Sequence, residues 1–142
     1  MISEGRVKVM YDEVTYDESD NLIKIETEFV DADGNPCLND EGIAVKTIEY
    51  DSEGRKTREA YFDVDGNPVA LSGYDPYDSV KTTYHDNGEV ATQTWFYRVK
   101  EHPNSYAKAT RKYDERGNII EVAYFDAEGK QLELRPKAGG ER

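Results

Sequence analysis

One short unit recurs along this chain, and its spacing restricts the accessible folds more than any other feature. A tyrosine that introduces a turn returns after 34, 34 and 29 residues, at Tyr16, Tyr50, Tyr84 and Tyr113. Repeats of this length are typical of supersecondary units that stack on one another. We therefore expect one repeat domain over residues 1–134, with copies at about 7–43, 44–78, 79–105 and 106–134, and a flexible tail or linker at 135–142.

An aromatic pair marks the end of each unit. It follows the leading tyrosine by 11 and 12 residues in the last three copies, as Tyr61-Phe62, Trp95-Phe96 and Tyr124-Phe125. The first copy is two residues longer and carries Phe29-Val30 instead. Because side chains alternate between the two faces of a strand, an insertion of two residues preserves the face. We expect all four phenylalanines to occupy equivalent places.

The residues between the turns favour strands. In Leu22–Val30, apolar or β-branched residues alternate with charged ones, which is the period of a half-buried strand. No window of 11 or more residues keeps a helical apolar stripe. An isolated hairpin is marginally stable in water, so each hairpin must pair with its neighbours. The sequence predicts an all-β fold: an elongated, twisted, solenoid-like antiparallel sheet of about eight strands, with a bulge near Asp12-Glu13 and a last short strand at 131–134.

Two turn signatures separate the strands. The first is Tyr-Asp-x-x-Gly at Tyr50–Gly54 and Tyr113–Gly117, and the second is Asp-x-Asp-Gly-Asn-Pro at 31–36 and 63–68. Glycine supplies the left-handed backbone that such turns need. The expected turn glycines are Gly34, Gly54, Gly66, Gly88, Gly117 and Gly129. The third copy has lost the acidic and glycine residues of its closing turn, at 98–103, so we expect its stacking to depart from the pattern.

The aromatic residues divide into a predicted core and a predicted surface row. The core contains the leading tyrosines and the phenylalanines, namely Tyr16, Tyr50, Tyr84, Tyr113, Phe29, Phe62, Phe96 and Phe125. Neighbouring residues on a strand face opposite ways, so Tyr61, Trp95 and Tyr124 then point outward. Such a row of rings suits sugar faces, quaternary amines or a protein partner. The alternative is that both faces are covered, or that the rings only support one another across strands.

The acidic turns admit a second interpretation. Asp31-x-Asp33-Gly34 and Asp63-x-Asp65-Gly66 resemble the opening of calcium loops, which supply oxygen ligands around a tight turn. No further acidic ligand recurs at a fixed distance, and Asp, Gly, Asn and Pro also favour turns for conformational reasons. We favour the purely conformational turn, and we predict no metal and no cofactor.

Composition excludes several classes of function. The 18 Lys and Arg residues against 30 Asp and Glu residues give a net charge of −12, which argues against a nucleic-acid partner. The apolar runs are far shorter than the roughly 20 residues of a membrane helix, and no signal peptide is recognisable after Met1. The single Cys37 is interpreted as a small loop residue, and neither His85 nor His102 belongs to a metal or nucleophile motif. We therefore expect a protein without enzymatic activity.

The repeated Tyr-Asp-x-x-Gly hairpin at Tyr50–Arg55 and Tyr113–Asn118 resembles the YD-type and MORN-like β-hairpin repeats of bacterial proteins. This resemblance implies a scaffold or binding surface, here an acidic, tyrosine-rich one facing a protein partner or the rest of a larger polypeptide. The sequence from Tyr124 to Gly129 is also similar to choline- and cell-wall-binding repeats, although those are shorter and richer in tryptophan. That similarity implies the alternative function, a carbohydrate or cell-envelope binder that uses Tyr61, Trp95 and Tyr124.

Overall fold

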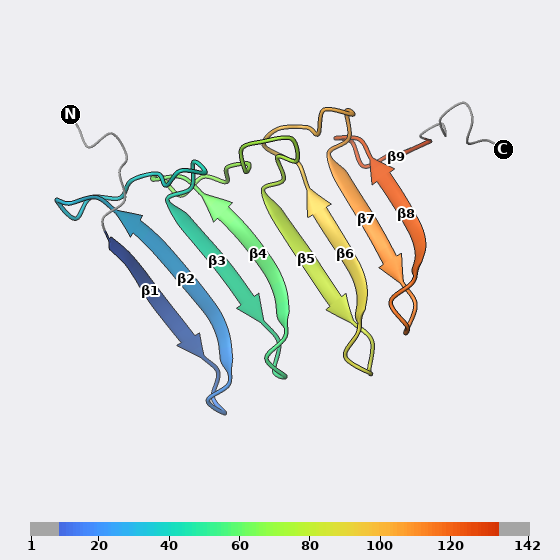
Figure 1. The fold of residues 1–142 in the computed structure, drawn as a ribbon, viewed down its shortest axis with the longest axis horizontal. Coiled ribbons are helices and arrows are strands. Elements are labelled where there is room, and N and C mark those ends of the chain that lie inside the picture. The colour runs from blue at the N-terminus through green and yellow to red at the C-terminus, as the bar shows by residue number, and fades with distance from the viewer. Residues whose placement is uncertain (1–8, 134–142) are drawn as a thin grey trace.

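The protein forms one open antiparallel sheet in which the strands follow their order in the chain. The computed structural model describes residues 9–133, so the predictions for residues 1–8, residue 134 and the tail lie outside the described part. The nine strands are β1 (Val9–Tyr16), β2 (Leu22–Val30), β3 (Val45–Tyr50), β4 (Lys56–Phe62), β5 (Ser79–Tyr84), β6 (Val90–Phe96), β7 (Lys108–Tyr113), β8 (Ile119–Phe125) and β9 (Gln131–Leu132). The predicted all-β sheet of tandem hairpins is confirmed (Figure 1).

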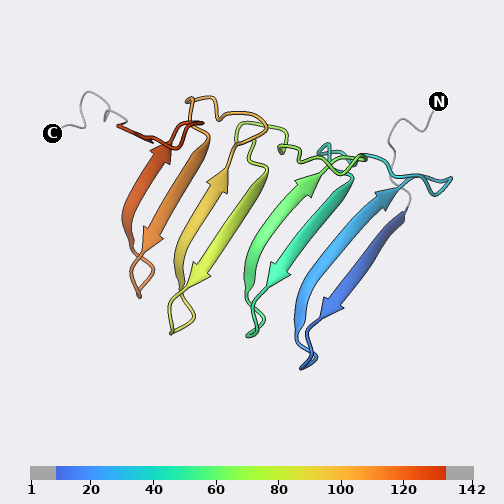
Figure 2. The ribbon, with the colours of Figure 1, turned by 180° about the vertical axis from the view of Figure 1, so that it is seen from behind.

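The four hairpins stand side by side in a single layer. Figures 1 and 2 show the tight hairpin turns along one edge of this layer and the longer connections along the opposite edge. Five residue pairs join β2 to β3, and five join β6 to β7, whereas only three join β4 to β5. Among the junctions between hairpins, pairing is therefore shortest at the middle of the sheet, where the connection over residues 63–78 is longest.

A bulge precedes the leading tyrosine of every hairpin. The register shifts between Thr15 and Tyr16, and at the equivalent places before Tyr50, Tyr84 and Tyr113. The bulge predicted at Asp12-Glu13 is wrong, because these two residues pair regularly with Thr27 and Glu26. The sequence here interrupts the alternation of apolar and polar residues, but the backbone pairing stays regular. The hydroxyl of Thr27 donates to Asp12 Oδ1 at 2.7 Å across the two strands.

All turns share one geometry. The N–H of the first residue donates to the carbonyl of the fifth, and the N–H of the fourth donates to the carbonyl of the first; these first residues are Asp17, Asp31, Asn39, Asp51, Asp63, His85, His102, Asp114 and Asp126. All six predicted turn glycines occupy the fourth place with positive φ. Asp20 and Ser105 take the same place at φ of 68° and 74°. The closing turn of the third copy therefore keeps the shared backbone although its sequence differs.

The core lies on one face of the sheet, near the edge that carries the connections. We call this the inner face; it bears Phe29, Tyr61, Trp95 and Tyr124, and the opposite, outer face bears Phe62, Phe96 and Phe125, as the strand register requires. One cluster joins Phe29 and Tyr61 to Ile43, and a second joins Tyr97, Tyr106 and Ala109 to Trp95 and Tyr124. The residues that cover the inner face come from the connections.

The predicted assignment of the two faces is therefore inverted. Tyr61 is only 4% exposed, whereas Phe62, Phe96 and Phe125 are partly exposed and lie outside both core clusters. Phe29 shares the face of Tyr61 rather than of Phe62, so the phenylalanines do not occupy equivalent places. The physical reason is that the connections fold over one face, and this choice is not written into the alternation of the strands.

The leading tyrosines join neighbouring hairpins instead of forming a core. Tyr84 donates its hydroxyl hydrogen to the carbonyl of Lys56, and Tyr113 donates to Gln93 Oε1 at 2.9 Å. Tyr50 is half-buried, and Tyr16, at the first hairpin, is 59% exposed. The prediction that these tyrosines form a buried core is thus wrong for Tyr16. For Tyr84 and Tyr113 the contact to a neighbouring repeat is made through the hydroxyl group.

Candidate functional site

The two segments that break the repeat pattern lie against each other. One is the tyrosine-rich stretch Leu71–Asp78 between β4 and β5, and the other is the connection between β6 and β7, at residues 97–107. The Tyr97 hydroxyl donates to Asp75 Oδ1 at 2.6 Å, and the Tyr74 ring meets the His102 ring edge-on at 4.9 Å. Departures from the repeat are thus concentrated at one place on the inner face.

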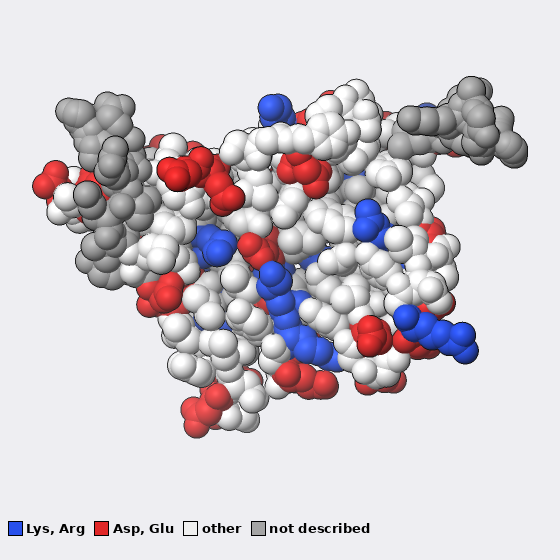
Figure 3. All heavy atoms as spheres, viewed as in Figure 1, with Lys and Arg blue, Asp and Glu red and all other residues white. Residues whose placement is uncertain are grey.

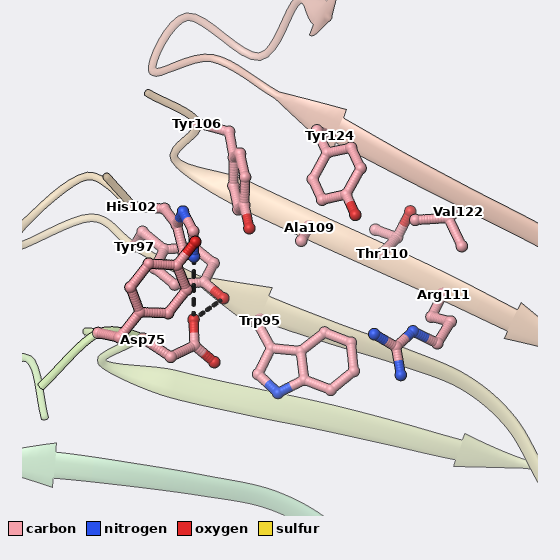
Figure 4. A pocket seen from close by; sticks show the side chains of 11 residues that line it. Asp75, Trp95, Tyr97, His102, Tyr106, Ala109, Thr110, Arg111, Val122 and Tyr124 are labelled. Carbon is pink, nitrogen blue, oxygen red and sulfur yellow. Dashed lines mark hydrogen bonds and ion pairs between the residues drawn. The ribbon is translucent and has the colours of Figure 1, made fainter. Parts of the chain in front are cut away.

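A pocket of about 260 Å³ opens where these segments meet β6, β7 and β8. Trp95, Ala109 and Tyr124 are opposite one another on the three strands, so a small residue stands between two large rings. Figure 4 shows the resulting hollow, with Trp95 on one side and Tyr106 and Tyr124 on the other. The pocket therefore originates from a large-small-large row across the sheet.

His102 belongs to the turn that supports one wall of this pocket. Its Nδ1 accepts the backbone N–H of Asn104 at 3.1 Å, the role that Oδ1 has in the turns that begin with aspartate. A neutral imidazole that accepts at Nδ1 carries its hydrogen at Nε2. Nε2 lies 3.7 Å from Asp75 Oδ1, and the ring stacks on Tyr106 at 4.3 Å. The side chain is 5% exposed, and its contacts with Asn104 and Tyr106 hold the turn against the wall of the pocket.

The charged groups of the pocket lie at its two ends. Figure 4 places Asp75 at one end and Arg111 at the other, with the Trp95 ring between them. The Arg111 guanidinium lies over that ring, 5.1 Å from its centre, and within residues 9–133 no carboxylate is within ion-pair distance of it. An arginine without an acidic neighbour is unexpected in a chain with 30 acids, and it leaves hydrogen-bond donors directed at the pocket.

Two tyrosines of the pocket, Tyr97 and Tyr106, have a raised pKa and remain neutral at physiological pH. Burial raises the pKa of Tyr106 to about 12, with the nearby Tyr124 and Asp75 acting in the same direction. Burial also raises the pKa of Tyr97, and its hydrogen bond to Asp75 adds to the effect. These phenols therefore act as hydrogen-bond donors and acceptors on apolar rings, which is the character of a binding wall.

A buried aspartate fastens the two irregular segments together. Asp78 is 1% exposed, and its Oδ2 accepts the backbone N–H groups of Arg98 at 2.7 Å and Val99 at 3.2 Å. Its Oδ1 accepts from the Arg98 guanidinium at 2.9 Å and from the Ser79 hydroxyl at 3.1 Å. Every acceptor site of this carboxylate is thereby used, which holds the connection after β6 against the start of β5.

The predicted aromatic row is divided by the structure. Trp95 and Tyr124 both line the pocket, whereas Tyr61 lies in the other cluster and donates its hydroxyl hydrogen to Glu59 Oε2 at 2.9 Å. Tyr77 lies between the two clusters, with ring centres 6.0 Å from Tyr61 and 6.4 Å from Tyr97. The three rings are therefore on the same face, but only two of them reach a common cavity.

Sequence reasoning missed most of the pocket lining. Asp75, Tyr97, Tyr106 and Arg111 fall outside the repeated aromatic pairs, and His102 was interpreted without a role. One signal was available, because each of the two stretches that depart from the repeat contains two tyrosines, Tyr74 and Tyr77 in one and Tyr97 and Tyr106 in the other. Irregular segments in a regular array are where a site can be added without disturbing the scaffold.

The acidic turns direct their carboxylates at their own backbone. Asp31 Oδ1 accepts the N–H groups of Asp33 at 2.9 Å and Asn35 at 3.0 Å, and Asp63 Oδ1 makes the equivalent bonds at 2.9 Å. Across the described residues, no three His, Cys, Asp or Glu side chains converge as a metal site would require. The turn geometry supports the conformational interpretation, since the lone pairs of Oδ1 are already used.

The negative charge is distributed over the molecule and does not form one patch on the face shown in Figure 3. Acidic and basic groups are interspersed over that face. Most acidic residues belong to the turns at the two edges of the sheet, so no single acidic patch is expected.

Residues 9–133 contain no apolar helix long enough to cross a bilayer. No protein-family model and no curated protein sequence matches this chain, so the function is argued from its geometry alone.

Proposed function

We propose that this protein is a non-enzymatic interaction module, a repeat scaffold whose acidic, tyrosine-rich surface binds a protein partner. The partner docks on the inner face, around the pocket between Trp95 and Tyr124. The observation that carries the proposal is the Arg111 guanidinium, which faces an aromatic cavity without an acidic neighbour among the described residues. Aromatic rings and arginine are the residues that dominate protein–protein binding energies.

The rest of the pocket supports a binding role. Tyr74 is 69% exposed beside it, and the carboxylate of Asp75, whose Oδ1 accepts from Tyr97, stands at the far end. A ligand that lies along the pocket can meet an acceptor at one end, a donor at the other, and rings between them. His102 is fixed in its turn by a backbone hydrogen bond, which favours a structural role over proton transfer.

Peptide selection tests this proposal directly. Phage-displayed random peptides are selected on the full chain, and the recovered peptides are titrated while the fluorescence of Trp95, the single tryptophan, is followed. Arg111→Ala is expected to weaken binding at least about tenfold, the effect of losing one charged contact of about 1.4 kcal/mol. Lys112→Ala is the matched control, because this half-exposed residue is adjacent on β7 and faces the outer side. Equal binding to both variants would contradict the proposal.

A carbohydrate partner is the second candidate function. It is favoured by one observation: Trp95 and Tyr124, two members of the predicted aromatic row, line the same pocket. Aromatic faces with polar groups around them are suited to sugar rings. Titration with soluble cell-wall fragments and with choline distinguishes the two functions. A change in Trp95 fluorescence that Tyr124→Ala abolishes would support this candidate over a protein partner.

A further inference from the structure

The two outermost hairpins leave strand edges without a neighbour. Within residues 9–133, β1 is paired on one side only. On the other side of the sheet, β9 covers β8 at only two positions, Tyr124 and Phe125. The remainder of β8, from Ile119 to Ala123, has β7 on one side and no described strand on the other. Backbone N–H and C=O groups on such an edge are available for pairing with another strand.

Both free edges carry exposed aliphatic side chains. Ile120 is 64% exposed and Val122 is 44% exposed on β8. On β1, Met10 is 62% exposed and Val14 is 40% exposed. Natural sheets usually protect an edge with lysine, proline or a further bulge. The uncovered part of β8 has no lysine or proline; it has the bulge at Ile120 and a single charged residue, Glu121, on its outer face.

The junctions inside the sheet indicate what such an edge binds. The second strand of one hairpin pairs antiparallel with the first strand of the next at β2–β3, β4–β5 and β6–β7. β8 is the second strand of its hairpin and β1 is the first strand of its own. Within residues 9–133, β1 has no strand on its outer side and β8 has only the two-residue β9, so each edge can accept the strand that the other represents. As few as three residue pairs suffice at such a junction, as β4–β5 demonstrates.

We propose that β8 of one copy of this chain pairs antiparallel with β1 of a second copy. The junction continues the sheet from one copy to the next, with Val122 on the same inner face as Met10 and Val14 and with Ile120 at the bulge beside them. Because the two edges differ, the contact is head-to-tail and does not close on itself, so assembly continues beyond the dimer. Val122 also borders the pocket, but the junction uses the backbone edge of β8, and its failure would leave the proposed function untouched.

The net charge sets the conditions under which the assembly forms. Two chains of charge −12 repel each other, and salt screens that repulsion over a Debye length of about 8 Å at physiological ionic strength. Association is therefore expected to strengthen with protein concentration and with added sodium chloride. Analytical ultracentrifugation of the full chain should show a mean mass that rises steadily and does not stop at the mass of a dimer.

Blocking one edge at a time tests the head-to-tail arrangement. Ile120→Lys places a charge on the β8 edge outside the pocket lining, and Val14→Lys places one on the β1 edge. Each variant alone is expected to remain a monomer, whereas an equimolar mixture forms a one-to-one dimer through the two intact edges. Val64→Lys, at a valine that is 48% exposed in a turn, is the control and should assemble like the unmodified chain. Urea unfolding of each variant verifies that the sheet is intact.

Three results would overturn the inference. The first is an unmodified chain that remains a monomer at all concentrations and salt levels. The second is a dimer formed by Val14→Lys alone, which would indicate symmetric pairing of two β8 edges. The third is a mixture of the two edge variants that shows no dimer although both variants are folded.

Discussion

The two faces of the sheet receive the two members of each aromatic pair, and only one face is covered. On the inner face, Tyr61 is buried beneath residues of the connections. On the outer face, Phe96 and Phe125 have no such cover and instead lie under the charged groups of Arg98 and Lys108, at 4.7 and 4.4 Å. The comparison teaches that the fold of the connections, and not the hydrophobicity of the strand residue, decides which ring becomes core.

The polar ends of the rings explain why tyrosine suits the covered face. A sheet one layer thick buries a ring only partly below a connection, so the hydroxyl group still needs a partner. Tyr61 finds Glu59, and Tyr97 finds Asp75. Phenylalanine has no group to satisfy and can pack its face against a cation in the presence of water. The less apolar residue is thus the better core residue in this architecture.

Removing one ring from each face tests most directly whether only the inner face forms a core. Tyr61→Ala should lower the free energy of unfolding by about 3–5 kcal/mol, because it leaves a cavity among Phe29, Ile43 and Tyr77. Phe62→Ala, the adjacent residue on β4, should cost only about 1–2 kcal/mol, because its ring is already partly in water. Urea unfolding followed by circular dichroism measures both. Equal losses, or a larger one for Phe62, would show that the outer face also forms a core.

The sequence was sufficient to predict the hairpins and insufficient to predict which face they bury. The spacing of the leading tyrosines and the turn glycines are local properties, and they predicted the single sheet and the order of its strands. The alternation of side chains along a strand places Tyr61 and Phe62 on opposite faces, but it does not indicate which of the two faces is buried. The buried face is determined by Ile43, Leu71 and Tyr106, which belong to the connections and pack against the inner face of the sheet.

The candidate site was predictable only in part for the same reason. Trp95 and Tyr124 belong to the repeated pair and were recognised. Asp75 and Arg111 are far apart in the chain, and they line the same pocket only after β5, β6 and β7 have paired. Asp78 gave no signal, because one acid among 30 is conspicuous only when it is found buried. Contacts between irregular segments depend on the tertiary fold and cannot be derived from local patterns.

A smaller effect is expected from the carboxylate that fastens the cover to the inner face. Asp78→Ala should cost about 2–3 kcal/mol, because it leaves the buried N–H groups of Arg98 and Val99 without an acceptor. The loss is moderated by the side chain of Arg98, which is 57% exposed and can return to water. Asp78→Asn, which keeps one acceptor oxygen, should fall between Asp78→Ala and the unmodified chain in thermal unfolding. Asp86→Ala, in an exposed turn, serves as the control, and a loss no greater than that of the control would contradict the assigned role.

The smallest predicted effect separates the hydroxyl of Tyr61 from its ring. Burial tends to raise the pKa of Glu59, but hydrogen bonds from Lys56 and Tyr61 outweigh it and hold the pKa below its ordinary value. A carboxylate of this kind stabilises the fold above its unfolded pKa, and the contribution is lost as the pH falls through the folded pKa. Tyr61→Phe should therefore cost about 1 kcal/mol at pH 7, and less after acidification below about pH 4.

The decisive measurement is how the difference in stability between the unmodified chain and Tyr61→Phe depends on pH. Asp17, Asp51 and Asp114 also have a lowered pKa, through backbone N–H groups in their turns, so the unmodified chain loses stability in acid for other reasons as well. Those aspartates are the same in Tyr61→Phe, and their effect cancels when the two urea midpoints are subtracted at each pH. The difference should shrink as the pH falls from 7 to 3. A constant difference would mean that Tyr61 stabilises the inner face through its ring alone, which would remove the reason given above for tyrosine on the covered face.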